Sequence, residues 1–110
     1  MKLIAQGIGV STGTVTGRVR ILLSPDELNQ LEHGEVLVVQ RSSPLWTVGM
    51  LRASAIISEV GGIISHAAIV AREMGVPCVV AVEHATVLLT NGMFVCVDGE
   101  AGTIHEAEDL

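Results

Sequence analysis

A histidine that follows a pair of glycines is the residue in this sequence best placed for chemistry. Gly61-Gly62 precede two isoleucines, and Ser65-His66 come next, ahead of an alanine-rich segment. Serine is a preferred N-cap, so Ser65 predicts a helix that begins at His66 and holds the imidazole in its first turn. Unpaired backbone N–H groups and the positive end of the helix dipole favour an anion at that position. We therefore expect this location to favour a small anion, such as a phosphoryl group, beside His66, Ser65 and the backbone of Gly61 and Gly62.

The expected protonation state of His66 suits this role. An ordinary histidine has a pKa of about 6.5, so a modest shift decides its charge near neutral pH. The positive helix end disfavours the imidazolium, which predicts a neutral ring with a nucleophilic nitrogen. If that nitrogen took a phosphoryl group, the new negative charge would meet the same backbone donors. We also expect Ile63 and Ile64 to limit water at the site, and a bulky residue at Gly62 to damage both the turn and phosphoryl access.

Other kinds of chemistry fit these residues less well. A histidine at a helix start is most often a capping or surface residue, which leaves a purely structural interpretation open. Ser65 and His66 are adjacent, so on a helix they point about 100° apart and cannot share a proton as a hydrolase triad does. We expect Arg72 to serve packing or partner docking. Metal binding is disfavoured because no two histidines lie at i,i+4 spacing among His33, His66, His84 and His105.

The elements that position this motif alternate between strands and helices. Continuous apolar runs predict strands buried on both faces at residues 36–39, 55–57 and 78–82. A serine before each helical pattern predicts helices at residues 24–34, 43–51 and 65–74. We expect Trp46, within the second of these helices, to anchor the core.

The two ends of the chain have a different pattern. Apolar residues on odd positions from Val15 predict a strand with one exposed face. Asn91-Gly92, between two apolar runs, predicts a tight hairpin, and Asp98 is expected to order a second turn. We therefore expect residues 1–110 to form a single α/β domain with mixed parallel and antiparallel pairing.

The composition excludes several classes of protein. Six Lys and Arg against twelve Asp and Glu give a net charge of −6, so no basic stripe is available for nucleic acid. No apolar run approaches the ~20 residues of a membrane helix. Cys78 and Cys96 form no CxxC pair and lie within apolar runs, so we expect buried free thiols and a cytoplasmic location.

The run from Gly61 to Pro77 reads Gly-Gly-Ile-Ile-Ser-His-Ala-Ala-Ile-Val-Ala-Arg-Glu-Met-Gly-Val-Pro. It resembles the phosphohistidine signature in the mobile domain of phosphoenolpyruvate-utilising enzymes, a family that includes pyruvate phosphate dikinase, phosphoenolpyruvate synthase and enzyme I. Ser43-Pro44-Leu45-Trp46 resembles the family's Thr/Ser-x-Pro-x-Trp segment. The glycines between residues 7 and 17 and the turn at 97–102 resemble its opening and closing segments, so the resemblance covers essentially the whole chain.

This resemblance implies a swivelling three-layer β/β/α domain in which His66 carries the phosphoryl group as an N-linked phosphohistidine. It also implies two partners. One is a nucleotide-binding domain, where ATP gives the phosphoryl group, and the other is a barrel domain that binds phosphoenolpyruvate or pyruvate. Mg²⁺ is expected in those partner domains.

The sequence departs from the family at Ile64, where many relatives have threonine. A threonine hydroxyl contact to the phosphoryl group is therefore lost, and we expect Ser65 to compensate. No GxxxxGK[ST] loop and no Mg²⁺-binding carboxylate set is evident, so we expect no cofactor on this chain alone and no turnover without partners. The chain is then either a fragment of a dikinase-type enzyme or a separately encoded carrier, and we expect the partners on separate chains. Two alternatives stay open: a non-catalytic regulatory or interaction module, and the carrier domain of an antibiotic phosphotransferase.

Overall fold

The strands of the protein join into one mixed sheet with the order β1-β8-β7-β3-β4-β5-β6-β2. The computed structural model describes residues 2–108. Its strands are β1 (Leu3–Gln6), β2 (Ile8–Ser11), β3 (Thr14–Ile21), β4 (Val36–Val39), β5 (Ala55–Ser58), β6 (Cys78–Val80), β7 (Phe94–Asp98) and β8 (Thr103–Glu106). Its helices are the 3-10 helices η1 (Pro25–Gln30) and η2 (Pro44–Trp46) and the α-helices α1 (Thr47–Met50), α2 (His66–Met74) and α3 (Ala85–Leu88). No helix in this described part of the chain is long and apolar enough to cross a membrane.

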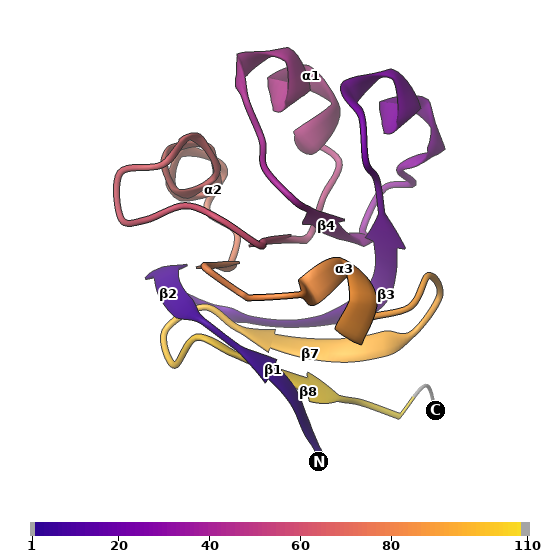
Figure 1. Ribbon diagram of the computed structural model, residues 1–110, viewed down its shortest axis with the longest axis vertical. Helices are drawn as coiled ribbons and strands as arrows, with labels where there is room; N and C mark the ends of the chain where they lie inside the picture. Colours follow the sequence, from indigo (N-terminus) through magenta and orange to yellow (C-terminus); the bar gives the residue numbers. More distant parts are fainter. Residues whose placement is uncertain (1, 109–110) are drawn as a thin grey trace.

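The sheet has two halves that share strand β3. Residues 14–18 of β3 pair antiparallel with β7, which continues to β8 and β1. Residues 19–21 of β3 pair parallel with β4, which continues to β5 and β6. We call these the antiparallel half and the parallel half. In Figure 1 the two halves lie one above the other, with α1 and α2 on the outer side of the parallel half.

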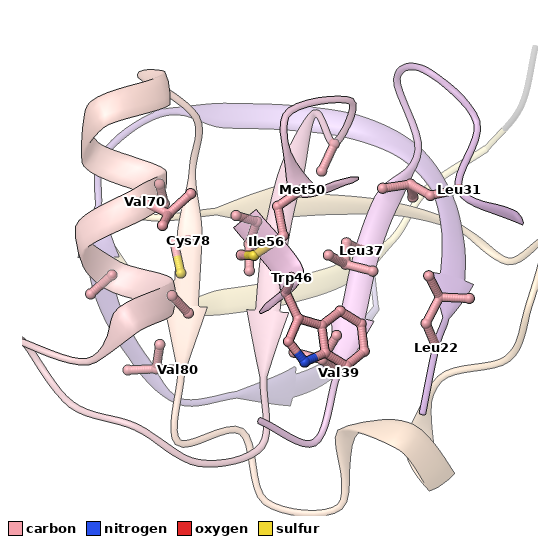
Figure 2. Packing of buried hydrophobic residues seen from close by; sticks show 14 of the residues in the cluster. Leu22, Leu31, Leu37, Val39, Trp46, Met50, Ile56, Val70, Cys78 and Val80 are labelled. Atoms are coloured by element: carbon pink, nitrogen blue, oxygen red, sulfur yellow. The ribbon is translucent and has the colours of Figure 1, made fainter. Parts of the chain in front are cut away.

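Side chains of the parallel strands alternate between two hydrophobic cores, which produces three layers. Leu37 and Ile56 face the helices and share a core with Trp46 and Met50, as Figure 2 shows. The alternate residues of the same parallel strands face the antiparallel half. They lie in a second core that contains Val36, Val38, Ile57, Val79, Val95, Val97 and Ile104. Every residue of β4 and β5 is buried, which confirms the prediction of strands covered on both faces. The α/β fold with mixed pairing is therefore confirmed, and Trp46 anchors the core as expected.

Strands β1 and β2 are consecutive in the chain, yet they lie at opposite ends of the strand order. Only Gly7 separates them, and its N–H donates to the carbonyl oxygen of Gly102 at 2.8 Å. A Cβ atom at position 7 would clash with the carbonyl oxygen of Val80, so glycine is required for this close approach. Strand β1 pairs with β8 and strand β2 with β6. The N-terminal segment therefore covers both ends of the sheet.

The helix predictions differ in their accuracy. The helix at 65–74 is confirmed as α2, which Gly75 ends in a left-handed conformation. The segment at 43–51 is helical but divided between η2 and α1. The segment at 24–34 forms only the 3-10 helix η1, whose cap is Ser24. Leu28 of η1, Trp46 of η2 and Met50 of α1 reach the core on the helix side of the sheet.

The predicted hairpin at Asn91-Gly92 is wrong. Residues 85–88 form the helix α3 rather than a strand, and Ala85 is buried in the core between the two halves. The Oδ1 of Asn91 accepts a hydrogen bond from the backbone N–H of Ile21 at 2.6 Å, so this turn binds the end of β3. A short apolar run fits a helix or a strand, and packing against the core decides between them. The turn at Asp98 is confirmed, because Oδ1 of Asp98 accepts from the N–H groups of residues 100 and 101.

Candidate functional site

The candidate site lies where β4 and β5 end and α2 begins. The Oγ of Ser65 accepts a hydrogen bond from the N–H of Ala68 at 3.5 Å, so Ser65 is the N-cap of α2 and His66 is its first residue. The same hydroxyl donates to the carbonyl oxygen of Gly62 at 2.8 Å. Its single proton is therefore committed to the turn, and a contact of Ser65 with a phosphoryl group would require this bond to open.

The two glycines before the helix have different roles. Gly61 adopts a φ of +124°, and a Cβ atom there would lie 2.9 Å from the Oγ of Ser65. Gly62 has no atom within 4 Å of a Cβ and needs no positive φ. The open space around a Cβ at Gly62 does not support the expected damage to the turn, because the steric and conformational demand falls on Gly61. The expected effect of a bulky residue at Gly62 on phosphoryl access stays a prediction.

Both ring nitrogens of His66 are held by hydroxyl groups. The Oγ of Ser42 lies 2.8 Å from Nδ1, and the Oγ1 of Thr47 lies 2.9 Å from Nε2. In a neutral imidazole one nitrogen donates and the other accepts, so one hydroxyl accepts the ring N–H and the other donates to the bare nitrogen. The imidazole is thereby fixed in orientation between the segment after β4 and the start of α1.

Partial burial lowers the pKa of His66 below its ordinary value of 6.5, because desolvation disfavours the charged imidazolium. The helix dipole predicts the same direction of the pKa shift, whereas its cause in the structure is burial. At neutral pH the ring is neutral and keeps a lone pair for nucleophilic attack.

A pocket of about 280 Å³ opens beside the imidazole. This size suits a small group rather than a drug-sized ligand. Its walls come from the segment after β4, from the end of β5 and from the start of α2, and the residues are Arg41, Ser42, Ser58, Val60, Gly61, Ser65, His66 and Ala67. The arrangement combines a neutral nucleophile, a helix N-terminus and one cation, which suits the binding of a small anion.

Large apolar side chains flank the site and face solvent. Leu45 lies two residues before Thr47 and Val48 directly after it, and their side chains are 81% and 82% exposed. Ile63 and Ile64, just before the helix, are 65% and 85% exposed. The expectation that these isoleucines shield the site from water is therefore wrong for the free chain. We call these four residues the apolar rim.

Sequence reasoning missed three residues of the site, namely Arg41, Ser42 and Thr47. A signal for Ser42 was present, because Ser42 is the first residue of the Thr/Ser-x-Pro-x-Trp pattern that continues to Pro44 and Trp46. Arg41 and Thr47 carry no comparable signal. Their place in the site depends on how the segment after β4 folds over the start of α2.

Other reactive side chains have structural roles. The Nε of Arg72 donates to the carbonyl oxygen of Val10 at 2.8 Å, which ties α2 to β2. Cys78 and Cys96 are buried free thiols, as expected, and burial raises the pKa of Cys78 to about 12. A protonated buried thiol does not compete with His66 as a nucleophile. Within residues 2–108, no group of three or more His, Cys, Asp or Glu side chains is arranged to hold a metal ion.

Comparison with solved structures agrees with this architecture. A solution structure of Enzyme I matches with a TM-score of 0.64 and 32% identity, over 74% of this chain and 34% of that chain. The crystal structure of Thermococcus kodakaraensis aconitase X matches with a TM-score of 0.72 over 94% of this chain and 98% of that chain, at 22% identity. The second likeness concerns the fold alone.

Comparison of sequences gives the family. The chain is 43% identical over 105 residues to a probable phosphoenolpyruvate synthase of Archaeoglobus fulgidus and 41% identical over 105 residues to the phosphoenolpyruvate synthase of Pyrococcus furiosus. These matches cover 96% of this chain but only 14% and 13% of the two synthases. Residues 31–102, which contain the whole site described above, match the family described as "PEP-utilising enzyme, mobile domain". The chain therefore belongs to the mobile-domain family of the phosphoenolpyruvate-utilising enzymes.

Proposed function

We propose that the chain is a phosphoryl carrier in which His66 accepts a phosphoryl group on a ring nitrogen and passes it to an acceptor. The observation that carries this proposal is the state of His66 itself. A neutral imidazole, held at both nitrogens by Ser42 and Thr47, opens on a small pocket at the N-terminus of α2. Covalent transfer through a side chain divides one difficult reaction into two easier steps.

The transfer step places specific demands on the site. The bare ring nitrogen attacks phosphorus, an N–P bond forms, and the bond from phosphorus to the donor's leaving group breaks. The proton on the other ring nitrogen is released when the resulting imidazolium returns to its neutral form. Because both nitrogens have hydroxyl partners, the hydroxyl that donates to the bare nitrogen must turn away first. In the second step the acceptor attacks phosphorus and the N–P bond breaks.

We further propose that the partners are a nucleotide-binding domain, where ATP is the donor, and a barrel domain that binds phosphoenolpyruvate or pyruvate. The similarity to phosphoenolpyruvate synthases supports this choice of substrates. Mg²⁺ is assigned to these partners, which we expect on separate chains. The apolar rim (Leu45, Val48, Ile63 and Ile64) supports docking, since exposed apolar patches around a site mark interaction surfaces. The free thiols favour action in the cytoplasm.

The test supplies the chain to a partner that lacks its own carrier histidine. The phosphoenolpyruvate synthase of Pyrococcus furiosus, with the residue that aligns with His66 replaced by alanine, is mixed with this chain, Mg²⁺, pyruvate and ATP labelled in its β- or γ-phosphate. We expect an acid-labile, base-stable label on His66 and renewed turnover. His66→Ala should accept no label, whereas the matched variant His33→Ala, at an exposed loop position, should behave like the wild type.

Three results would contradict the proposal or a part of it. Equal labelling of the His66→Ala variant would place the phosphoryl group elsewhere. Absence of label on the wild-type chain from ATP, and also from labelled phosphoenolpyruvate, would favour a non-catalytic module. Turnover by the chain alone would contradict the expected need for partners.

A further inference from the structure

We infer that Arg41 is a catalytic residue of this site and that its guanidinium binds the phosphoryl group carried by His66. The identity of the anion rests on the proposed function, but the observations on Arg41 are independent of it. Arg41 lies in the segment between β4 and η2, and it lines the same pocket as His66. It directly precedes Ser42, whose hydroxyl contacts Nδ1 of the imidazole. The segment that orients the ring therefore also carries the cation.

The charge distribution around the pocket singles out Arg41. Arg41 is the only lining residue with a permanent charge, and no lining residue is a carboxylate. The chain as a whole has a net charge of −6. A locally positive pocket in an acidic protein therefore attracts a small anion to this place and away from the rest of the surface. A cation at the point where phosphoryl charge arrives also stabilises the transfer step.

Arg41 is free to bind such an anion. Within residues 2–108 the structure gives its side chain no hydrogen bond or ion pair. The other arginines have partners in the fold: Arg18 the ring of Phe94, Arg20 the carboxylate of Glu35, Arg52 the carbonyl oxygen of Leu28, and Arg72 the carbonyl oxygen of Val10. An exposed arginine without a partner pays no cost of breaking an ion pair when a ligand arrives.

The opposite wall of the pocket offers no substitute for Arg41. Residues 61–66 contain no lysine or arginine, and Ile63 and Ile64 bring only hydrocarbon to this edge. The start of α2 contributes backbone N–H groups, which favour negative charge but carry no net charge themselves. A planar guanidinium can donate two parallel hydrogen bonds to one phosphoryl group, which a single backbone amide cannot do. Arg41 and the helix start are therefore complementary donors on two sides of one pocket.

The experiment uses the whole chain and two small probes. Inorganic phosphate is titrated into the protein, and its dissociation constant is read from NMR shifts of the His66 ring and of the amides of residues 61–68. Phosphoramidate then serves as a chemical phosphoryl donor, and the rate of His66 modification is followed by ³¹P NMR. In that reaction a bare ring nitrogen attacks phosphorus, the phosphorus–nitrogen bond of the reagent breaks, ammonia leaves, and the ring N–H proton passes to solvent.

Three variants make the test specific. We expect Arg41→Gln to weaken phosphate binding and to slow His66 modification, each by about tenfold, as for the loss of a hydrogen bond to a charged group. Arg41→Lys should fall between, because it keeps the charge but loses the planar fork. Arg18→Gln removes the same charge on β3, outside the pocket, and should stay within about twofold of the wild type. Unfolding in urea checks that all variants fold equally.

The outcomes separate this inference from the proposed function. Equal phosphate binding and equal modification rates in Arg41→Gln and wild type would overturn the role of Arg41 and leave the carrier proposal standing. Arg41-dependent phosphate binding, without any modification of His66, would uphold the anion site and count against the carrier. A slower modification rate in Arg41→Gln, with unchanged phosphate binding, would place the contact of Arg41 in the transfer step.

Discussion

The parallel and antiparallel halves of the sheet use similar aliphatic residues, but only the parallel half carries the candidate chemistry. Parallel strands need crossover segments, and those segments leave the sheet from the same edge, beyond the carboxyl ends of the strands. The segment after β4 brings Ser42 and Thr47 to that edge, and the segment after β5 brings Gly61 and His66. The antiparallel strands β7 and β8 are joined by a short turn at Asp98 and place no comparable group.

The two halves of this small domain therefore have different roles, one in closing the core and one in supporting the site. The antiparallel half closes the inner core, with Val95, Val97 and Ile104 fully buried. The parallel half is buried on both faces, so its strands are rigid supports for the segments that leave their ends. Ligand sites of open α/β sheets lie beyond the carboxyl ends of the strands for the same topological reason. The comparison predicts that substitutions at the site in the parallel half affect the chemistry of His66, and that substitutions in the core of the antiparallel half affect the free energy of unfolding.

The largest expected effect is the loss of phosphoryl acceptance in His66→Ala. The substitution removes the nucleophile together with its hydrogen bonds to Ser42 and Thr47. We expect modification by phosphoramidate at this position to be abolished, while the free energy of unfolding falls by only about 1 kcal/mol. Urea unfolding and ³¹P NMR measure the two effects. A loss of several kcal/mol would show that His66 is mainly a structural residue.

The converse substitution is Ile104→Ala in β8. Ile104 is fully buried in the core between the halves, so we expect its truncation to cost about 3 kcal/mol. The rate of His66 modification per folded molecule should stay unchanged, since Ile104 lies in the half without the site. Urea unfolding gives the first quantity, and ³¹P NMR under native conditions gives the second. A large change in the native rate would contradict the division between the halves.

A matched pair of glycine substitutions sharpens the comparison within the parallel half. In Gly61→Ala the turn would force alanine into a positive φ and its Cβ against Ser65. We therefore expect the free energy of unfolding to fall by about 2 kcal/mol and His66 to be modified more slowly. Gly62→Ala meets no neighbouring atom, so its unfolding free energy should match that of the wild type to about 0.5 kcal/mol. Equal effects of the two substitutions on the free energy of unfolding would contradict the special requirement for glycine at position 61.

The smallest expected effect concerns pH. Folding lowers the pKa of His66, so the unfolded chain binds this proton more readily than the folded one. His66 therefore has no effect on stability well above pH 6.5 and destabilises the folded state as the pH falls through 6.5. NMR titration should give a midpoint for His66 below 6.5 in the folded chain, and a higher one in urea. A folded midpoint above the unfolded one would contradict the burial of this ring.

The parts of the fold that the sequence predicted well are those with local signals. Helix α2 was predicted to within a residue because Ser65 and Gly75 bound it at either end. The buried strands β4 and β5 were evident because their runs of four and three consecutive apolar residues leave no exposed face. The helix α3 was missed because its signal is tertiary. The carboxylate of Glu59 accepts from the backbone N–H and the hydroxyl of Thr86, and no pattern within residues 85–88 indicates this distant partner.

The same distinction applies to the site. His66 and Ser65 lie in one continuous motif, so one reading of the sequence finds both. Thr47 lies 19 positions before His66, yet its hydroxyl is 2.9 Å from the ring. Such a contact depends on the crossover from β4 to β5. The exposure of Leu45 and Val48 was equally hidden, because an apolar stripe predicts burial unless a partner is considered.

The N-terminal segment, residues 2–11 with a bend at Gly7, covers strand edges that could otherwise pair with other molecules. Strands at the ends of a sheet can recruit further strands, and proteins blunt these edges by keeping them short or bent. Here one segment supplies both outermost strands, each only four residues long, with the bend at Gly7 between them. Without residues 2–11, β6 would present the unpaired apolar edge Cys78-Val79-Val80 to other molecules. The segment thus protects both edges of the sheet against edge-to-edge aggregation.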